Sequence, residues 1–166
     1  MESKNKWETQ PRETNGQFGE RPKTLRLSLG IWQKALDGMA KVLHKKVDQN
    51  AKGGSYGELR KETAGNKSVE IHHMPADSTS PLSRWKGPCI TLEKEEHQKT
   101  ASHPKTDGSS IYREKQRKLI KRGKFFSDEI LDILDIIKKT GIKYFKALSD
   151  KVDYEIELYK RGEIHE

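Results

Sequence analysis

Two short β-favourable runs, separated by a loop and followed by a helix-favouring stretch, constrain the fold of this chain most. The first run is Val69-Glu70-Ile71, which leads into His72 and His73, and the second is Cys89-Ile90-Thr91-Leu92. Proline, glycine and serine punctuate the residues between them, and residues 93–100 favour a helix with acidic residues in its first turn. The order of strand, loop, strand and helix predicts a small α+β core.

Apolar residues at helical spacing predict four longer helices around this core. The first covers residues 25–47, and the others cover about 110–123, 127–141 and 143–159. A short helical turn is also expected at residues 55–61. The predicted fold class is therefore α+β, with one N-terminal helix and additional C-terminal helices.

The chain of 166 residues has room for one ordinary domain. Only 31% of its residues are hydrophobic and 35% are charged, so part of the length is expected to lie outside a packed core. Residues 1–23 mix glycine, proline and charges without a period, which predicts a flexible arm. Residues 24–53 predict an amphipathic helix and a polar linker, and residues 54–162 predict the domain itself.

The charge balance favours a polyanionic partner. Lysine and arginine number 33 against 25 acidic residues, which gives a formal net charge of +8 and a pI near 9.4. Nucleic acid is the first partner to consider for such a chain. The alternative is that the excess of positive charge reports only solubility.

The predicted helix at 110–123 concentrates this charge. Its side chains would supply contacts to phosphates that do not depend on base sequence. The alternative is a solvated helix face held in place by Tyr112, Leu119 and Ile120. The candidate nucleic-acid-binding residues are Arg113, Lys115, Arg117, Lys118, Lys121, Arg122 and Lys124.

Cysteine content and hydropathy limit the class of protein further. Cys89 is the single cysteine, so an intramolecular disulfide framework is excluded. The N-terminal residues contain no apolar signal segment, and no stretch approaches the roughly 18 to 20 apolar residues of a spanning helix. A soluble chain without membrane contact is expected.

Histidines are the candidates for chemistry. His72 and His73 end the first β-favourable run, and His97 follows on the short helix. Hydrolysis of a phosphodiester needs a base to activate water and a positive centre to neutralise charge, and imidazole can act as base or metal ligand. The alternative is that the adjacent histidines are a surface accident or a turn, and a closed zinc site lacks the usual cysteine pairs.

Three segments together resemble a known family. They read VEIHHMPADS, PLSRWKGPCITLEKEEHQKTAS and YREKQRKLIKRGKF, the last followed by a helix rich in aspartate and isoleucine. The chain resembles, over roughly residues 54–158, the nuclease domains of the HNH superfamily found at the C-termini of bacterial polymorphic toxins. The resemblance implies a ββα-metal core.

The resemblance also implies roles for the histidines. His73 would be the general base, and His72 and His97 would be ligands of one divalent metal ion: magnesium, manganese, nickel or zinc. Glu96 stands where an aspartate is expected before the helical histidine. His103 and Glu93 are further candidate ligands.

The function implied by the resemblance is a metal-dependent endonuclease, with DNA the preferred substrate, that acts as a bacterial toxin effector. Such a protein would be cytoplasmic or secreted by a specialised system into a target bacterial cell, and an acidic immunity protein would mask its basic surface. The alternatives are an RNase that uses the same site and a non-enzymatic DNA-binding or phage-associated structural protein. Trp32 and Trp85 are expected in the core or on a partner surface rather than as base-stacking platforms.

Overall fold

The computed structural model describes residues 23–43 and 46–165, with side chains from residue 30 onward. The arm expected at residues 1–23 therefore lies almost entirely outside the described residues. The elements in chain order are α1 (Lys23–Val42), β1 (Gly53–Ser55), α2 (Tyr56–Glu62), β2 (Val69–His73), the 3-10 turn η3 (Arg84–Lys86), β3 (Pro88–Glu93), α3 (Lys94–His97), α4 (Ser109–Lys121), α5 (Phe125–Thr140) and α6 (Phe145–Lys160). The described part of the chain thus has the predicted α+β class.

The sheet is antiparallel and has the strand order β1-β3-β2. In β3 every residue from Pro88 to Leu92 is buried, which explains its continuous apolar run. Val69 pairs with Glu93, and His73 pairs with Cys89. The two predicted strands are therefore neighbours, and β2 forms an edge of the sheet.

The third strand was not expected from the sequence. The sequence predicts that residues 24–53 end in a polar linker, whereas Gly53, Gly54 and Ser55 form β1. A Cβ atom at Gly53 would lie 2.0 Å from the carbonyl oxygen of Ala147 in α6. Glycine is needed at this position because the strand backbone passes directly against the helix backbone.

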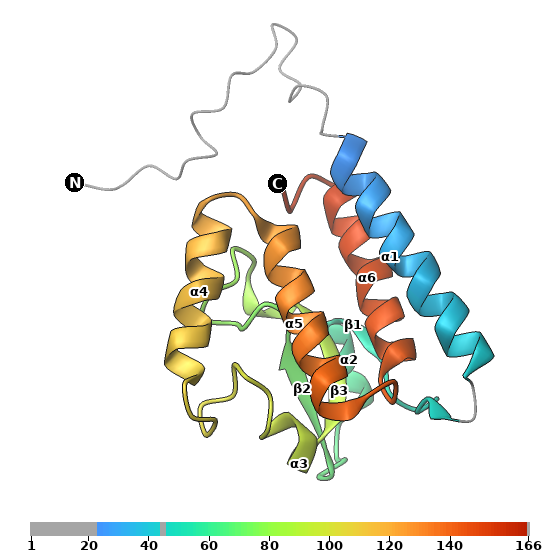
Figure 1. The fold of residues 1–166 in the computed structure, drawn as a ribbon. Coiled ribbons are helices and arrows are strands. Elements are labelled where there is room, and N and C mark those ends of the chain that lie inside the picture. Colours follow the sequence, from blue (N-terminus) through green and yellow to red (C-terminus); the bar gives the residue numbers. More distant parts are fainter. Residues whose placement is uncertain (1–22, 44–45, 166) are drawn as a thin grey trace, which may run out of the picture.

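Helices cover the sheet and complete one core. Helix α6 packs against β1 and β3, α1 lies alongside α6, and α4 lies beside α5 (Figure 1). The core contains Leu36 of α1 as well as sheet residues such as Ile90, so the N-terminal helix belongs to the same packed unit. Other buried members of this core are Met74, Leu92, Ile133, Ile136, Leu148, Val152 and Leu158.

A buried polar layer joins α4, α5 and α6. The Nε2 atom of Gln116 donates a hydrogen bond to Oδ2 of Asp132 at 2.8 Å. The ammonium group of Lys151 donates to Glu129 and, at 2.6 Å, to Oε1 of Glu155. Because these groups are desolvated, their mutual contacts fix how the three helices face one another. None of the helices in the described ranges is long and apolar enough to span a membrane.

Candidate metal and nucleic-acid site

The candidate site includes side chains from both faces of the edge strand β2, near its C-terminal end. Side chains alternate along a strand, so Glu70 and His72 share one face and Ile71 and His73 share the other. The two histidines still line one hollow of about 470 Å³, together with His97. Both histidines reach the same opening because β2 is an edge strand and no further strand pairs with its outer side.

Glu70, His97 and His103 form the cluster that best matches a metal site. One potential ligand atom from each of them lies within 4.8 Å of those of the other two. The Oε2 atom of Glu70 lies 2.6 Å from Nδ1 of His97, and the rings of His97 and His103 have centroids 4.9 Å apart. We call Glu70, His97 and His103 the metal triad; two imidazoles and one carboxylate can hold a divalent transition metal and leave positions open.

His72 lies directly behind the metal triad. Its ring centroid is 5.1 Å from that of His97, and its side chain is buried. Burial, followed by the neighbouring charge of His97, holds the pKa of His72 well below its usual range. His72 is therefore a neutral imidazole beside the triad, although it is not one of the three residues with clustered ligand atoms.

His73 occupies a fixed position on the opposite face of β2. Its ring stacks on Tyr56 with centroids 4.7 Å apart, and its Nε2 atom lies 3.2 Å from the carbonyl oxygen of Arg84. A carbonyl only accepts, so Nε2 carries the proton and Nδ1 keeps its lone pair. Burial lowers the pKa of His73, and the Arg84 carbonyl and the charge of Asp77 partly oppose that effect.

Local structure places these partners of His73. The Oγ atom of Ser55 accepts from the backbone nitrogen of Glu58 at 3.2 Å and donates to its carboxylate, which caps α2 and fixes Tyr56 as its first residue. A Cβ atom at Gly87 would lie 2.7 Å from Cδ2 of His73. The imidazole is thus held between an aromatic ring and a glycine.

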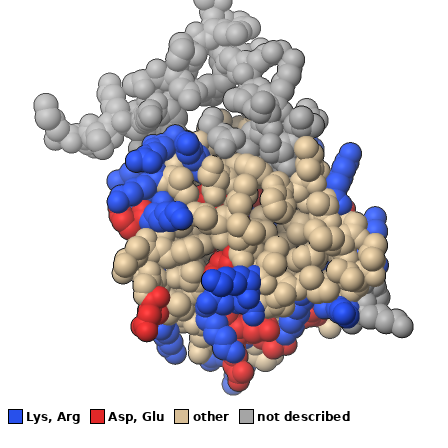
Figure 2. Space-filling view, viewed as in Figure 1, with Lys and Arg blue, Asp and Glu red and all other residues tan. Residues whose placement is uncertain are grey.

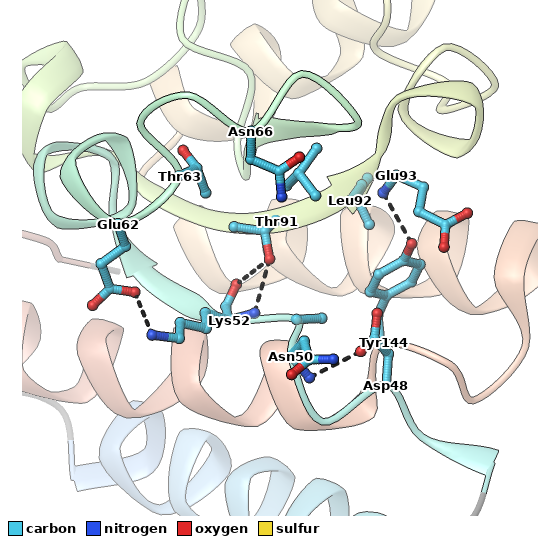
Figure 3. Close-up of a pocket in the computed structure, with 12 residues that line it drawn as sticks. Asp48, Asn50, Lys52, Glu62, Thr63, Asn66, Thr91, Leu92, Glu93 and Tyr144 are labelled. Atoms are coloured by element: carbon cyan, nitrogen blue, oxygen red, sulfur yellow. Dashed lines mark hydrogen bonds and ion pairs between the residues drawn. The ribbon is translucent and has the colours of Figure 1, made fainter.

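Glu93 does not lie with the histidines. Its Oε1 atom is 2.9 Å from the ammonium of Lys143, and the residue lines a different hollow with Tyr144 (Figure 3). The structure therefore does not bring this predicted ligand to the metal triad. Glu96, which precedes His97, accepts from Lys143 at 3.0 Å and from the Tyr144 hydroxyl. These contacts anchor α3, which carries His97.

The predicted basic helix contributes one residue to the site itself. Arg113 donates to the carbonyl of Ser102 at 2.6 Å and lines the hollow that contains His103. Arg117 pairs with Glu114. Figure 2 shows lysine and arginine side chains gathered over the C-terminal end of α4, which points away from α3 in Figure 1. The exposed basic residues of this region are Lys115, Lys118, Lys121, Arg122 and Lys124.

Sequence reasoning missed several residues of the site. Glu70 could have been found, because it is two positions before His72 and therefore on the same strand face. Tyr56 and Arg84 gave no such signal, because their contacts with His73 depend on the sheet and η3. Trp85 was expected in the core or on a partner surface, but its side chain is 62% exposed beside Tyr56; it is not a core residue.

No family model, no curated protein and no solved structure matches this chain.

Proposed function

We propose that this chain is a metal-dependent endonuclease whose ββα-metal core consists of β2, β3 and α3. The observation that carries the proposal is the convergence of the metal triad, His72 and His73 at one edge of the sheet. The order and antiparallel pairing of β2 and β3, followed by α3, agree with the resemblance to HNH nucleases. The positive charge of the chain supports a nucleic acid as the substrate, and the family resemblance favours DNA.

The donor set fits one divalent cation. Imidazole nitrogens favour zinc or nickel over magnesium, and a single carboxylate adds a charged oxygen of the kind that manganese and magnesium prefer. His97 and His103 would bind through nitrogen and Glu70 through oxygen, and the ring centroid of His72 lies 5.1 Å from that of His97. A cation held there would stabilise negative charge on a phosphate and on its leaving oxygen.

His73 is the proposed general base. Its Nδ1 atom keeps the lone pair because Nε2 faces the Arg84 carbonyl. This nitrogen would accept the proton of the water that attacks the phosphorus atom. Arg113, which lines the same hollow, would neutralise a phosphate of the bound strand.

The first experiment compares plasmid cleavage by the wild type, His73→Ala and His97→Ala with manganese, nickel, zinc or magnesium, and with EDTA. We expect His73→Ala to bind metal and not cleave, and His97→Ala to lose both properties. A metal content equal to that of the wild type in His97→Ala would refute the metal triad. Cleavage of RNA but not of DNA by the wild type would keep the site and change the substrate.

We further propose that the nuclease acts as a bacterial toxin. It rests on the family resemblance and on the exposed basic surface over α4, which an acidic immunity protein could mask. We expect induced expression in bacteria to arrest growth, His73→Ala to relieve the arrest, and an adjacent acidic gene product to protect the cells. Normal growth with active wild-type enzyme present would contradict the toxin role.

A further inference from the structure

An exposed aromatic group lies next to the proposed base and has no role in the chemistry described above. Trp85 in η3 is 62% exposed. Its ring meets Tyr56 edge to face, with centroids 5.6 Å apart, and the guanidinium of Arg84 lies 5.0 Å from the centre of the Tyr56 ring. We call Tyr56, Arg84 and Trp85 the aromatic shelf.

The aromatic shelf continues directly into the site. Tyr56 contacts Trp85 at one end and stacks on His73 at the other. Arg60 lines both the hollow of about 490 Å³ under Trp85 and the hollow of about 250 Å³ that contains His73 and His97. A ligand that occupies the site can therefore reach Trp85 without leaving this surface.

The charges around the shelf suit a phosphate backbone. Arg60 and Lys61 are exposed and line the hollow beside Trp85, and the Arg84 side chain is 60% exposed, with its Nε atom 3.8 Å from a carboxylate oxygen of Asp77. Glu58 also borders this hollow, but its carboxylate accepts from Ser55 as part of the α2 cap. The shelf thus combines a free aromatic face with cations, which is the combination that binds unpaired nucleotides.

From these contacts we propose that the aromatic shelf stacks the base of a nucleotide flanking the scissile phosphate, so that the enzyme prefers single-stranded or locally unpaired nucleic acid. The inference rests on the proposed nuclease function and specifies its substrate. A phosphate at His73 places the neighbouring nucleotide over Tyr56 and Trp85, two ring contacts away. Bases inside a duplex are already stacked on each other and offer no free face to Trp85, whereas unpaired bases do.

The test is binding of a fluorescently labelled oligonucleotide, measured by anisotropy in EDTA so that metal-dependent cleavage does not interfere. The probes are a single-stranded DNA and a blunt two-stranded duplex of the same length. We expect Trp85→Ala to weaken single-strand binding roughly 5- to 100-fold, as for the loss of one stacked base. Trp85→Phe should retain most of the affinity, and duplex binding should not change.

The matched control is Leu134→Ala, which removes another exposed apolar side chain, 51% exposed on α5. It should leave both affinities unchanged, and thermal unfolding should be the same for all variants because Trp85 is exposed. Single-strand binding by Trp85→Ala equal to that of the wild type would overturn the proposal, as would an equal loss with the duplex.

The outcomes separate this inference from the proposed function. If the wild type cleaves DNA and Trp85→Ala binds single strands normally, the nuclease stands and the shelf proposal fails. If no cleavage occurs with any metal but single-strand binding depends on Trp85, the shelf stands as a nucleic-acid surface and the nuclease proposal fails.

Discussion

The Oε2 atom of Glu70 lies 2.6 Å from the Nδ1 atom of His97, although the two residues are 27 positions apart. The carboxylate of Glu70 fixes the ring of His97 and leaves Nε2 of that ring available to a metal ion. The hydrogen bond with His97 lowers the pKa of Glu70, and burial partly opposes this effect. Glu70 is therefore ionised and can bind a cation.

Glu70 is the residue by which the metal triad can be tested most sharply. Glu70→Ala and Glu70→Gln both remove the carboxylate, and we expect each to weaken zinc or manganese binding about 10- to 100-fold in calorimetry. The neutral amide of glutamine still accepts a hydrogen bond from His97, so it preserves the ring orientation. Wild-type affinity in Glu70→Gln would show that Glu70 only orients His97 and is not a ligand.

The position of His73 depends on a missing side chain. Gly87→Ala would put a Cβ atom 2.7 Å from Cδ2 of His73 and push the imidazole from its place on Tyr56. We expect kcat for DNA cleavage to fall about 100-fold, since a displacement of about 1 Å can cost this much. Metal affinity should not change. The backbone of Gly87 has φ −57°, which alanine adopts without strain.

The control for this substitution is Gly38→Ala in α1, where an added Cβ atom has open space around it. Cleavage by this variant should equal that of the wild type. If Gly87→Ala cleaves at the wild-type rate, His73 does not act from the position that the structure gives it.

The strand, loop, strand and helix order was accessible from the sequence because each element has a local signal. Strand β3 is buried from Pro88 to Leu92 because both of its neighbours and α6 cover it, and most of these residues are apolar. Strand β1 had no such signal, because Gly53 and Gly54 have low strand propensity, and α6 requires a bare backbone at Gly53. Its formation depends on a contact about 90 residues away.

The candidate site also combines residues that the sequence indicates with residues that it does not. The pairing of His72 with His97 follows from chain order, and Glu70 follows from strand alternation. Glu93 is a candidate ligand from the sequence, whereas in the structure its carboxylate lies 2.9 Å from the ammonium of Lys143. The sequence predicts Trp85 in the core or on a partner surface from its residue type alone. In the structure η3 turns it away from the core, so it is exposed.

Lys151 should be essential to the packing of the C-terminal helices. It is completely buried between Glu129 and Glu155, and burial lowers its pKa. Lys151→Met leaves two buried carboxylates without a cation, which we expect to cost about 3 to 5 kcal/mol in urea denaturation. Lys146→Met, which removes a half-exposed pair with Asp150, should cost at most about 1 kcal/mol.

A second result would support the same explanation for Lys151. If the unpaired carboxylates cause the loss, changing both to glutamine in the Lys151→Met background should recover part of the stability. No recovery would indicate that the length and packing of the lysine side chain matter more than its charge.

Asp128 should make the stability depend on pH. Burial raises its pKa from 3.8 to about 7, against the opposing charge of Lys151. The folded state therefore binds more protons than the unfolded state between about pH 4 and pH 7, so this residue makes stability fall as pH rises through that window. Above pH 7 both states are ionised and its contribution is constant.

Asp128→Asn removes this dependence without changing the size of the side chain. We expect the variant to be about 4 kcal/mol more stable than the wild type at pH 8 and about 2 kcal/mol more stable at pH 5, where only the unfolded carboxyl is ionised. Thermal unfolding at the two pH values measures the difference. The amide oxygen can still accept from Gln116, whose Nε2 atom lies 3.4 Å from the carboxylate. If Asp128→Asn is instead destabilised at pH 8 and not at pH 5, the ionised carboxylate stabilises α6 through Lys151, and burial is not the larger effect.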